Sequence, residues 1–216
     1  IRDLVRSRGL GDVYKRQRLV ATLYGWLTTV ERERPPFTVA ATETSARLAL
    51  GGLVLSFRID RVDALADGGA AIIDYKSGRV PAPSKWFAPR PSGTQVGLYA
   101  LARRDVAPDE PLRAAAYAQL KAGDVALAGL AADADAWPAL RTPAEARNVD
   151  FATWADVEGF WRERYGALAA AFRVGDAAVL PRDAQACRRC DLQPVCRVRA
   201  LDDAVPEPEE DERDGA

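Results

Sequence analysis

The sequence predicts a mixed α/β domain, and three observations carry this prediction. The expected elements follow one another as helix, antiparallel strands, helix, strand and helix, which is the order of a mixed sheet flanked by helices. The chain has 216 residues, 48% hydrophobic and 28% charged, as in an ordinary globular domain with room for a small appendage. The turn signal Asp67-Gly68-Gly69 joins two strand-like segments into a hairpin.

The first half of the chain contains one expected helix and three strand-like segments. Apolar residues recur at helical spacing over 18–34, until the pair Pro35-Pro36 stops the pattern. Three strand-like segments follow, at 37–43, 47–63 and 70–76. The pair Gly51-Gly52 is a candidate break in the segment 47–63. The hairpin turn falls between the last two strands.

The second half begins with a Pro-rich loop over 80–93 that carries Trp86 and Phe87. We expect a helix at 94–104, a strand at 112–121 that stops at Gly123, and a long loop at 131–148, followed by a regular helix at 151–173. Six residues on one face of that last helix recur at steps of three and four, which is typical of a face turned toward the core: Trp154, Val157, Trp161, Tyr165, Leu168 and Phe172.

The two ends of the chain differ in composition from the rest. Residues 1–17 keep no sustained period and resemble translated adaptor sequence, so we expect them to be non-native or disordered. Residues 201–216 hold eight acidic residues and one basic residue, which predicts a disordered acidic tail. The other 200 residues carry 29 basic and 23 acidic residues, a mildly basic balance that is compatible with a nucleic-acid partner.

Composition excludes several function classes. The chain contains no histidine, which rules out a Ser-His-Asp triad, a Cys-His dyad and a His-ligated zinc enzyme within it. No apolar run approaches the roughly 18–20 residues of a membrane span, and no secretory signal is recognisable. Chemistry must therefore use carboxylates, lysine, thiols or a metal held by oxygen ligands.

A set of charged residues lies at the ends of two paired strands. Asp74 and Lys76 are two residues apart in a strand and so share a face. With an odd-numbered hairpin loop, Asp60 pairs opposite Asp74, with Cβ atoms about 5 Å apart. Two carboxylates so close repel each other unless a cation such as Mg²⁺ or Mn²⁺ lies between them. An even-numbered loop would place Asp60 on the opposite face, and a solvated surface salt bridge is the alternative interpretation of the set.

The three cysteines of the chain lie within ten residues as Cys187-x-x-Cys190-x5-Cys196. An odd number of clustered thiols is no disulfide framework, but it is typical of ligands to zinc or to an iron–sulfur cluster. Such a site normally needs a fourth ligand, and histidine is absent. Free or buried thiols in a loop are the alternative.

The segments FRIDRVD and IIDYKSG, followed by Gln95-x-x-x-Tyr99, resemble the RecB-like nuclease domains of the PD-(D/E)XK superfamily, most closely the AddB-type repair nucleases. The resemblance implies a restriction-endonuclease-like three-layer core over 18–180, a mixed sheet flanked by helices. It further implies a Mg²⁺- or Mn²⁺-dependent phosphodiesterase site. Carried over to this sequence, Asp60 and Asp74 are the catalytic metal ligands and Lys76 is the catalytic lysine. Glu43, on an earlier element, would be a further metal ligand, and the catalytic residues Gln95 and Tyr99 would lie on a helix that borders the site. This sequence departs from the family in the first segment, where it has Phe57 or Ser56 at a position that is frequently glycine.

The same resemblance implies a 4Fe–4S cluster in a cysteine segment at 181–200. Cys187, Cys190 and Cys196 would supply three ligands, and the fourth cysteine, upstream in the family, is missing from this chain. The substrate would be DNA, as a single strand or a duplex end. The partner would be a helicase, and the protein would be located in the bacterial cytoplasm, at the nucleoid. An iron–sulfur or zinc DNA-binding module without catalysis, or a pure interaction domain, remains the alternative.

Two further expectations concern side chains near this site. Asp63 would face away from Asp60 in a regular strand, and we expect it to pair with Arg61 or a nearby base rather than to bind metal. Trp86 or Phe87 could stack on the bases of a bound strand, although a tryptophan in such a loop more often serves as an anchor.

Overall fold

The computed structural model describes residues 10–147 and 149–196. The chain divides into two compact units, Ile1–Arg173 and Val174–Ala216, which are treated separately. The predicted acidic tail at 201–216, and the first nine residues of the segment expected to be non-native, lie outside the described residues.

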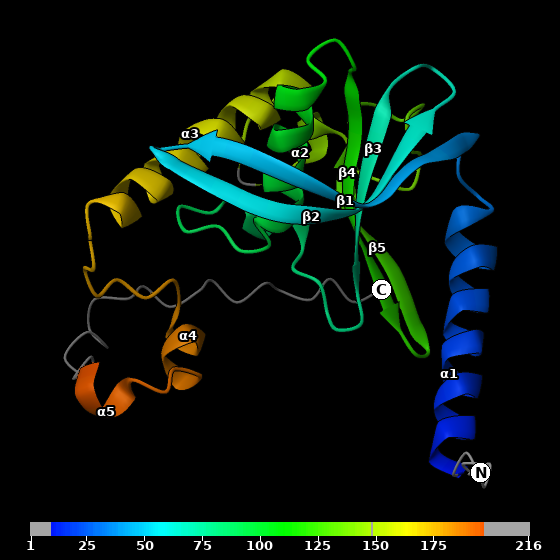
Figure 1. Ribbon diagram of the computed structural model, residues 1–216, viewed down its shortest axis with the longest axis horizontal. Helices are drawn as coiled ribbons and strands as arrows, with labels where there is room; N and C mark the ends of the chain where they lie inside the picture. Colours follow the sequence, from blue (N-terminus) through cyan, green and yellow to red (C-terminus); the bar gives the residue numbers. More distant parts are fainter. Residues whose placement is uncertain (1–9, 148, 197–216) are drawn as a thin grey trace, which may run out of the picture. The chain divides into compact units, whose positions relative to one another are not determined.

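The first unit is built on a five-stranded mixed sheet in the order β1-β2-β3-β4-β5 (Figure 1). All neighbouring strands are antiparallel except β3 and β4, which are parallel. The predicted α/β class is confirmed. The strands span Phe37–Leu50, Leu53–Leu65, Ala70–Lys76, Leu112–Lys121 and Asp124–Ala131.

Helices α2 (Gln95–Val106) and α3 (Trp154–Arg173) cover one face of the sheet. Val157, Trp161 and Tyr165 of α3 are buried there, as the aromatic stripe predicts. The stripe does not continue to the end of the helix, because Leu168 is 45% and Phe172 77% exposed. The prediction that the stripe faces the core is therefore correct up to Tyr165 and wrong for Leu168 and Phe172.

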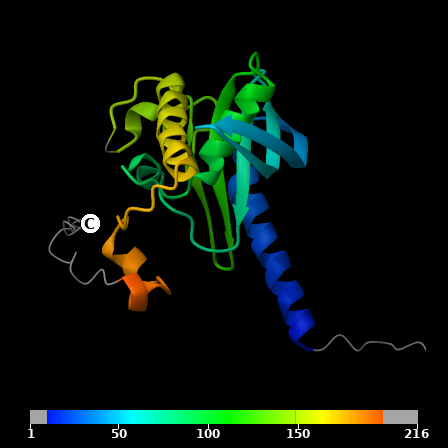
Figure 2. The same ribbon diagram turned by 60° about the vertical axis from the view of Figure 1, so that its left-hand side comes forward.

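The other face of the sheet is covered by the N-terminal segment and the loop after β5. Trp26, at the end of α1 (Leu10–Trp26), is buried in one cluster with Ile73 and Trp137. Figure 2 shows α1 and α3 on opposite sides of the sheet, so the unit has three layers. A π-helical turn, Leu27–Glu31, continues α1.

The first helix begins at Leu10, eight residues before the predicted start at 18. Residues 11–21 of α1 are exposed throughout, including Val13 at 45% and Tyr14 at 65%. A helical segment that packs against nothing has no need of an apolar period, which is why the pattern did not reveal this part of the helix.

The predicted break at Gly51-Gly52 is the turn of a long β1–β2 hairpin. Both glycines have positive φ, 56° and 79°. A Cβ atom on Gly51 would collide with the backbone of α3 at Gly166 and at Ala170, so glycine is required both for the turn and for the close approach of the helix. Strand β1 combines the predicted segment 37–43 with the first residues of 47–63, and β2 contains the remainder of 47–63 after the turn.

Strand β5 was not predicted. Its sequence DVALAGLA is rich in alanine and glycine, which have low strand propensity. These small residues are required by packing, because a Cβ atom on Gly129 would approach Ala116 of β4 at 2.6 Å. The loop after β5 contains one 3-10 turn, Pro143–Glu145, and otherwise agrees with the predicted long loop.

The second unit contains two short helices, α4 (Ala184–Arg188) and α5 (Gln193–Cys196). The Asp183 carboxylate accepts a hydrogen bond from the Ala186 amide at the start of α4. Within the part of the chain that the structure describes, no helix combines the length and apolarity needed to cross a membrane.

Candidate active site

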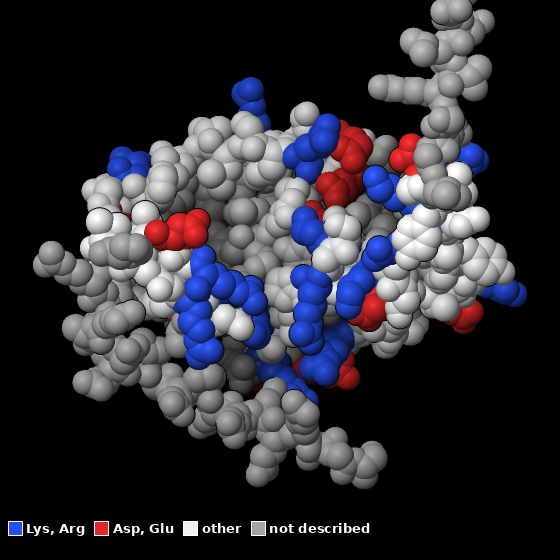
Figure 3. Space-filling model, turned by 90° about the horizontal axis from the view of Figure 1, so that it is seen from below, with Lys and Arg blue, Asp and Glu red and all other residues white. Residues whose placement is uncertain are grey.

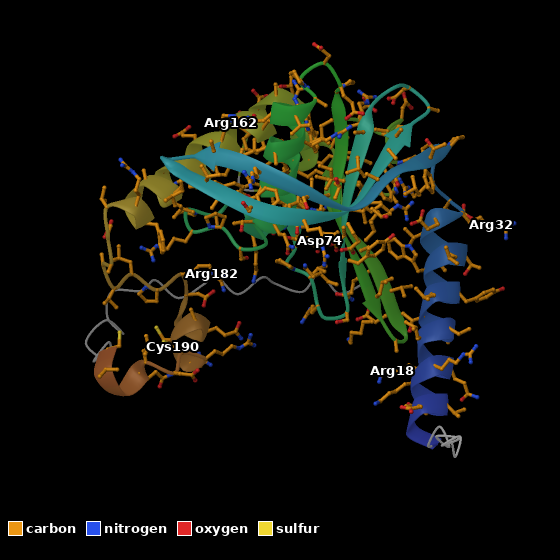
Figure 4. All side chains as sticks on the ribbon, in the orientation of Figure 1. Arg18, Arg32, Asp74, Arg162, Arg182 and Cys190 are labelled. Carbon is orange, nitrogen blue, oxygen red and sulfur yellow. The ribbon has the colours of Figure 1, made fainter. Side chains whose placement is uncertain are left out.

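The end of strand β3 carries an acid and a lysine on one face, as the strand period predicts. The Asp74 side chain is fully buried, and its Oδ2 lies 2.6 Å from Lys76 Nζ. The Lys76 side chain is 37% exposed. Figure 4 shows Asp74 near the place where β3 passes the β1–β2 hairpin. One member of the pair is thus held in the interior while the other reaches solvent.

Asp60 is brought to Asp74 by the hairpin register. Strands β2 and β3 pair Arg61 with Ile73 and Ala64 with Ala70, which is the register of an odd-numbered loop. The β2–β3 backbone hydrogen bonds end at the pair Arg61–Ile73. Beyond this pair the Tyr75 amide donates to the Asp60 carboxylate at 2.9 Å instead of to a backbone carbonyl. The prediction that Asp60 lies beside Asp74 is confirmed by this geometry.

Burial of Asp74 has an electrostatic consequence. Loss of solvation raises the pKa of the Asp74 carboxyl, the nearby Asp60 charge raises it further, and Lys76 opposes both effects. Asp74 Oδ1 has no hydrogen-bond partner among the described residues. A buried carboxylate oxygen without a donor, next to a second carboxylate, is a chemically suitable position for a hard cation.

Gln95 and Tyr99 of α2 complete the contacts of the lysine. Lys76 Nζ donates to Gln95 Oε1 at 2.7 Å, and Gln95 Nε2 donates to the Tyr99 hydroxyl oxygen. The Tyr99 ring packs on Phe57 of β2, with centroids 5.2 Å apart. Burial raises the pKa of Tyr99 despite the Gln95 hydrogen bond, and the charges of Asp74 and Asp60 add to the increase. The four-residue spacing places Gln95 and Tyr99 on one face of α2, and this face meets Lys76, as the family resemblance implies.

Tyr117 is a residue of the site that sequence reasoning missed. It lies beside Asp74 in the parallel β3–β4 register, and its hydroxyl accepts a hydrogen bond from the Val96 amide at 3.4 Å. Lys76 Nζ is 5.8 Å from its ring centroid. Burial raises the pKa of Tyr117 to about 12, so the hydroxyl is protonated at neutral pH. The available signal was a single large aromatic residue in the strand AAAYA.

Glu43 lies on β1 at the position opposite Asp60, between the pairs Thr42–Arg61 and Thr44–Ile59. Its backbone has a φ of 51°, and its carboxylate pairs with Arg58 at 2.7 Å in an exposed position. Nowhere in the described ranges do three acidic or thiol side chains converge to hold a metal ion. The site as it stands has two adjacent carboxylates, with Glu43 one strand away.

The strand alternation of the β1–β2 hairpin breaks at this same place. On β1, Ala41 faces the helices α2 and α3, and so do Ala46 and Leu48, although 41 and 46 differ in parity. On β2, Ile59 and Val62 both face that core, three residues apart. Each strand therefore has one extra residue at the level of Glu43 and Asp60, which lie opposite each other.

A second cluster of charges lies on the opposite face of the sheet. Asp63 is fully buried and accepts from Arg61 Nε at 2.6 Å, while Arg34 Nη2 lies 2.8 Å from its second oxygen. Glu31 lies 2.9 Å from Arg61 Nη1, and Arg61 also donates to the Tyr75 hydroxyl at 2.7 Å. The predicted pairing of Asp63 with Arg61 is confirmed.

This cluster reaches the site through the backbone of β3. Tyr75 stands between Asp74 and Lys76, with its side chain on the far face and its amide donating to Asp60. The Arg34 guanidinium lies over the Phe37 and Trp137 rings, 3.9 and 3.8 Å from their centroids. The N-terminal segment is thereby connected to the peptide that carries the acid–lysine pair.

The geometry contradicts base stacking by Trp86 or Phe87, and it gives no support for the iron–sulfur cluster. Trp86 is fully buried and Phe87 is 5% exposed, so neither can stack on a base, and both are anchors of their loop. Cys190 is exposed, Cys187 and Cys196 are partly buried, and these three thiols do not converge as metal ligands in the described structure. The residues present in this arrangement do not fit an assembled iron–sulfur cluster.

Comparison with known proteins identifies the family of the chain. The family model of the PD-(D/E)XK nuclease superfamily matches residues 3–197, which is most of the chain. The chain belongs to the PD-(D/E)XK nuclease superfamily. Its five-stranded mixed sheet flanked by helices is consistent with the restriction-endonuclease-like core expected for such a protein. No curated protein matches the sequence.

Proposed function

We propose that this PD-(D/E)XK domain is a deoxyribonuclease that depends on Mg²⁺ or Mn²⁺ and hydrolyses phosphodiester bonds. The observation that carries the proposal is the state of Asp74. Its carboxylate is fully buried beside Asp60, and one oxygen lacks a donor while Lys76 contacts the other. Such a carboxylate is electrostatically unfavourable unless it has a cationic ligand to bind.

Asp60 and Asp74 are the residues that would hold the metal. Mg²⁺ in proteins is commonly bound by about one or two carboxylates, with waters and substrate phosphates as its other ligands, so two carboxylates suffice. A bound Mg²⁺ or Mn²⁺ would supply Lewis acidity and a water of lowered pKa. One Asp60 oxygen is already occupied by the Tyr75 amide, which fixes the orientation of the carboxylate.

Lys76 is suited to stabilise negative charge on a phosphate. Its ammonium group is held by Asp74 on one side and by the Gln95 amide oxygen on the other, yet a third of the side chain is open to solvent. Gln95 is in turn fixed by Tyr99. A positioned cation next to the reacting phosphate acts most strongly in such a partly desolvated site.

The cysteine segment takes no part in this proposal, because its three thiols do not converge in the described residues. A role in double-strand-break repair or recombination, a helicase partner and a 4Fe–4S cluster rest on the sequence resemblance alone. Iron and acid-labile sulfide content of the anaerobically purified chain tests the cluster independently of cleavage, and an iron-free folded chain would remove it from the account.

The test of the proposed function is cleavage of single-stranded and duplex DNA by the full chain in Mg²⁺, in Mn²⁺ and in EDTA. We expect metal-dependent cleavage that falls to background in Asp74→Asn and drops at least tenfold in Lys76→Ala, because these changes remove a metal ligand and the phosphate-stabilising charge. Asp109→Asn is the matched control, since Asp109 is exposed and lies between the end of α2 and Leu112, which pairs with Ala70 at the end of β3 opposite Asp74.

A second measurement separates metal binding from catalysis. Mn²⁺ binding, followed by its electron paramagnetic resonance signal, should weaken in Asp60→Asn and in Asp74→Asn. Glu43→Gln should bind Mn²⁺ as the original chain does, because its carboxylate is paired with Arg58. A folded chain that binds DNA but cleaves none with either metal would contradict the proposal and favour a non-catalytic DNA-binding module.

A further inference from the structure

The loop between β3 and α2 begins and ends at the proposed site. Residues 77–94 connect Lys76 directly to Gln95, the two residues whose side chains share a hydrogen bond. This segment, SGRVPAPSKWFAPRPSGT, has three basic residues, four prolines and no acidic residue. We refer to residues 77–94 as the basic loop.

The basic loop is anchored to the domain by buried contacts. Trp86 is fully buried and packs edge-on against Tyr117, with centroids 5.6 Å apart. The Val80 amide donates to Gln119 Oε1 of β4 at 3.1 Å. Gly93 has a φ of 71°, and a Cβ there would approach Trp86 Nε1 at 3.0 Å, so the chain also folds closely over its own anchor.

Prolines and backbone contacts further restrict this segment. Pro81, Pro83, Pro89 and Pro91 fix φ at four positions. The Ser92 amide donates to the Lys85 carbonyl oxygen at 3.0 Å and closes the loop on itself. A segment that is already ordered loses little conformational entropy when it binds a ligand.

The three basic side chains of the loop point outward. Arg79, Lys85 and Arg90 are all exposed, and none of them forms an ion pair within the described ranges of the chain. Many other arginines of the first unit are paired with acids, among them Arg58, Arg103 and Arg113. Figure 3 shows basic side chains gathered on one face of the molecule. The Arg79 charge helps to lower the pKa of the exposed Asp124 carboxyl, but the loop itself holds no acidic residue, so it presents net positive charge on a fixed support.

We propose that the basic loop binds the phosphate backbone of the DNA strand that enters the Asp60–Asp74–Lys76 site. This inference rests on the proposed nuclease function, because the loop has both of its ends in that site. Phosphate contacts by exposed arginine and lysine position a strand without reading its sequence. Arg79, three residues after Lys76, would hold the backbone nearest the scissile phosphate, with Lys85 and Arg90 farther along the loop.

The test is equilibrium binding of a fluorescent oligonucleotide to the full chain in EDTA, at a series of KCl concentrations. Each phosphate contact contributes roughly 0.7 to the slope of log K against log salt for single strands and roughly 0.9 for duplexes. The triple variant Arg79→Gln, Lys85→Gln, Arg90→Gln should therefore reduce the slope by about 2–3 and weaken binding at least tenfold at low salt. Comparison of both oligonucleotide types shows which form of DNA uses the loop.

The matched control is the triple variant Lys15→Gln, Arg18→Gln, Arg32→Gln. It removes the same charge from exposed positions on α1 and directly after the π-helical turn Leu27–Glu31, and Figure 4 shows Arg18 and Arg32 well apart from Asp74. Its slope should stay within about 0.5 of the original. Thermal unfolding should be unchanged in both triple variants, since all six side chains are exposed.

An unchanged salt slope in the basic-loop variant would overturn the proposal. An equal reduction of the slope in the control variant would also overturn it, because the effect would then come from net charge alone. Absence of DNA binding by the original chain would also overturn it. Because binding is measured in EDTA, its outcome is independent of hydrolysis. A chain that binds through the loop but cleaves nothing would refute the nuclease function while supporting the loop as a DNA-binding element.

Discussion

Asp63 and Asp74 are both fully buried and lie on neighbouring strands, but on opposite faces of the sheet. Asp63 contacts two guanidinium groups, those of Arg61 and Arg34, which in turn contact Glu31. Asp74 has one ion pair, with Lys76, and an oxygen without a partner next to a second carboxylate. One buried acid is fully compensated by the protein, and the other is left incomplete.

The difference indicates which buried charge is structural and which is functional. A buried carboxylate is tolerated only when donors and cations surround it, and Asp63 meets that requirement within the chain. Asp74 meets it only in part, and a bound metal ion would complete the compensation under the proposed function. Arg61, which compensates Asp63, also donates to the Tyr75 hydroxyl, and Tyr75 lies between Asp74 and Lys76 on β3.

The largest effect on stability is expected from Asp63→Ala. The change leaves Arg34 and Arg61 without their shared partner, and breaking a buried ion pair from one side costs about 3–5 kcal/mol of unfolding free energy. Urea unfolding followed by circular dichroism measures it. Asp105→Ala is the control, because Asp105 pairs with Arg162 in an exposed position, where such a loss costs less than about 1 kcal/mol. Equal losses would abolish the distinction drawn between buried and exposed acids.

A smaller effect is expected from Tyr75→Phe, which removes only the hydroxyl that accepts a hydrogen bond from Arg61. The unfolding free energy should fall by about 1 kcal/mol, as for the loss of one hydrogen bond. DNA cleavage should fall less than in Lys76→Ala, because the Tyr75 amide that orients Asp60 is unchanged. Cleavage that falls as far as in Lys76→Ala would give the far face a direct part in the chemistry.

The smallest effect is a change in pH dependence on Asp74→Asn, measured by urea unfolding in EDTA. Burial raises the pKa of folded Asp74 above its ordinary value of 3.8, so the unfolded chain loses this proton first as the pH rises. Ionisation of Asp74 therefore lowers the unfolding free energy between its ordinary pKa and its raised pKa in the fold. Relative to Asp74→Asn, the original chain should be less stable above that window than below it. A difference independent of pH would show that Lys76 compensates Asp74 fully.

The sequence alone could locate the site because its geometry follows from local rules. Strand periodicity places Asp74 and Lys76 together, an odd hairpin loop brings Asp60 to them, and four-residue spacing aligns Gln95 with Tyr99. These relations need no knowledge of packing. The structure brings these five side chains together as expected, while their catalytic and metal-binding roles stay predictions.

Features that depend on long-range packing could not be predicted in the same way. Strand β5 has weak propensity and is fixed by contact with β4, while Tyr117 reaches the site only through the parallel β3–β4 register. Burial of Trp86 depends on contacts with Trp161 and Tyr117, which are distant in sequence. The partners of Asp63 include Arg34, whose position depends on how the N-terminal segment crosses the sheet.

Glu43 and Asp60 are extra residues that face each other, so the alternation of side chains on either side of them is the same with or without the pair. Deleting Glu43 alone would leave Asp60 as a one-sided bulge on β2, while the cross-strand pairs from Thr44–Ile59 to the Gly51-Gly52 turn would be kept, because that turn fixes their register. Deleting Glu43 and Asp60 together would restore a regular ladder, but it would remove a site carboxylate. The irregularity of the hairpin is thus the place from which Asp60 reaches the Tyr75 amide.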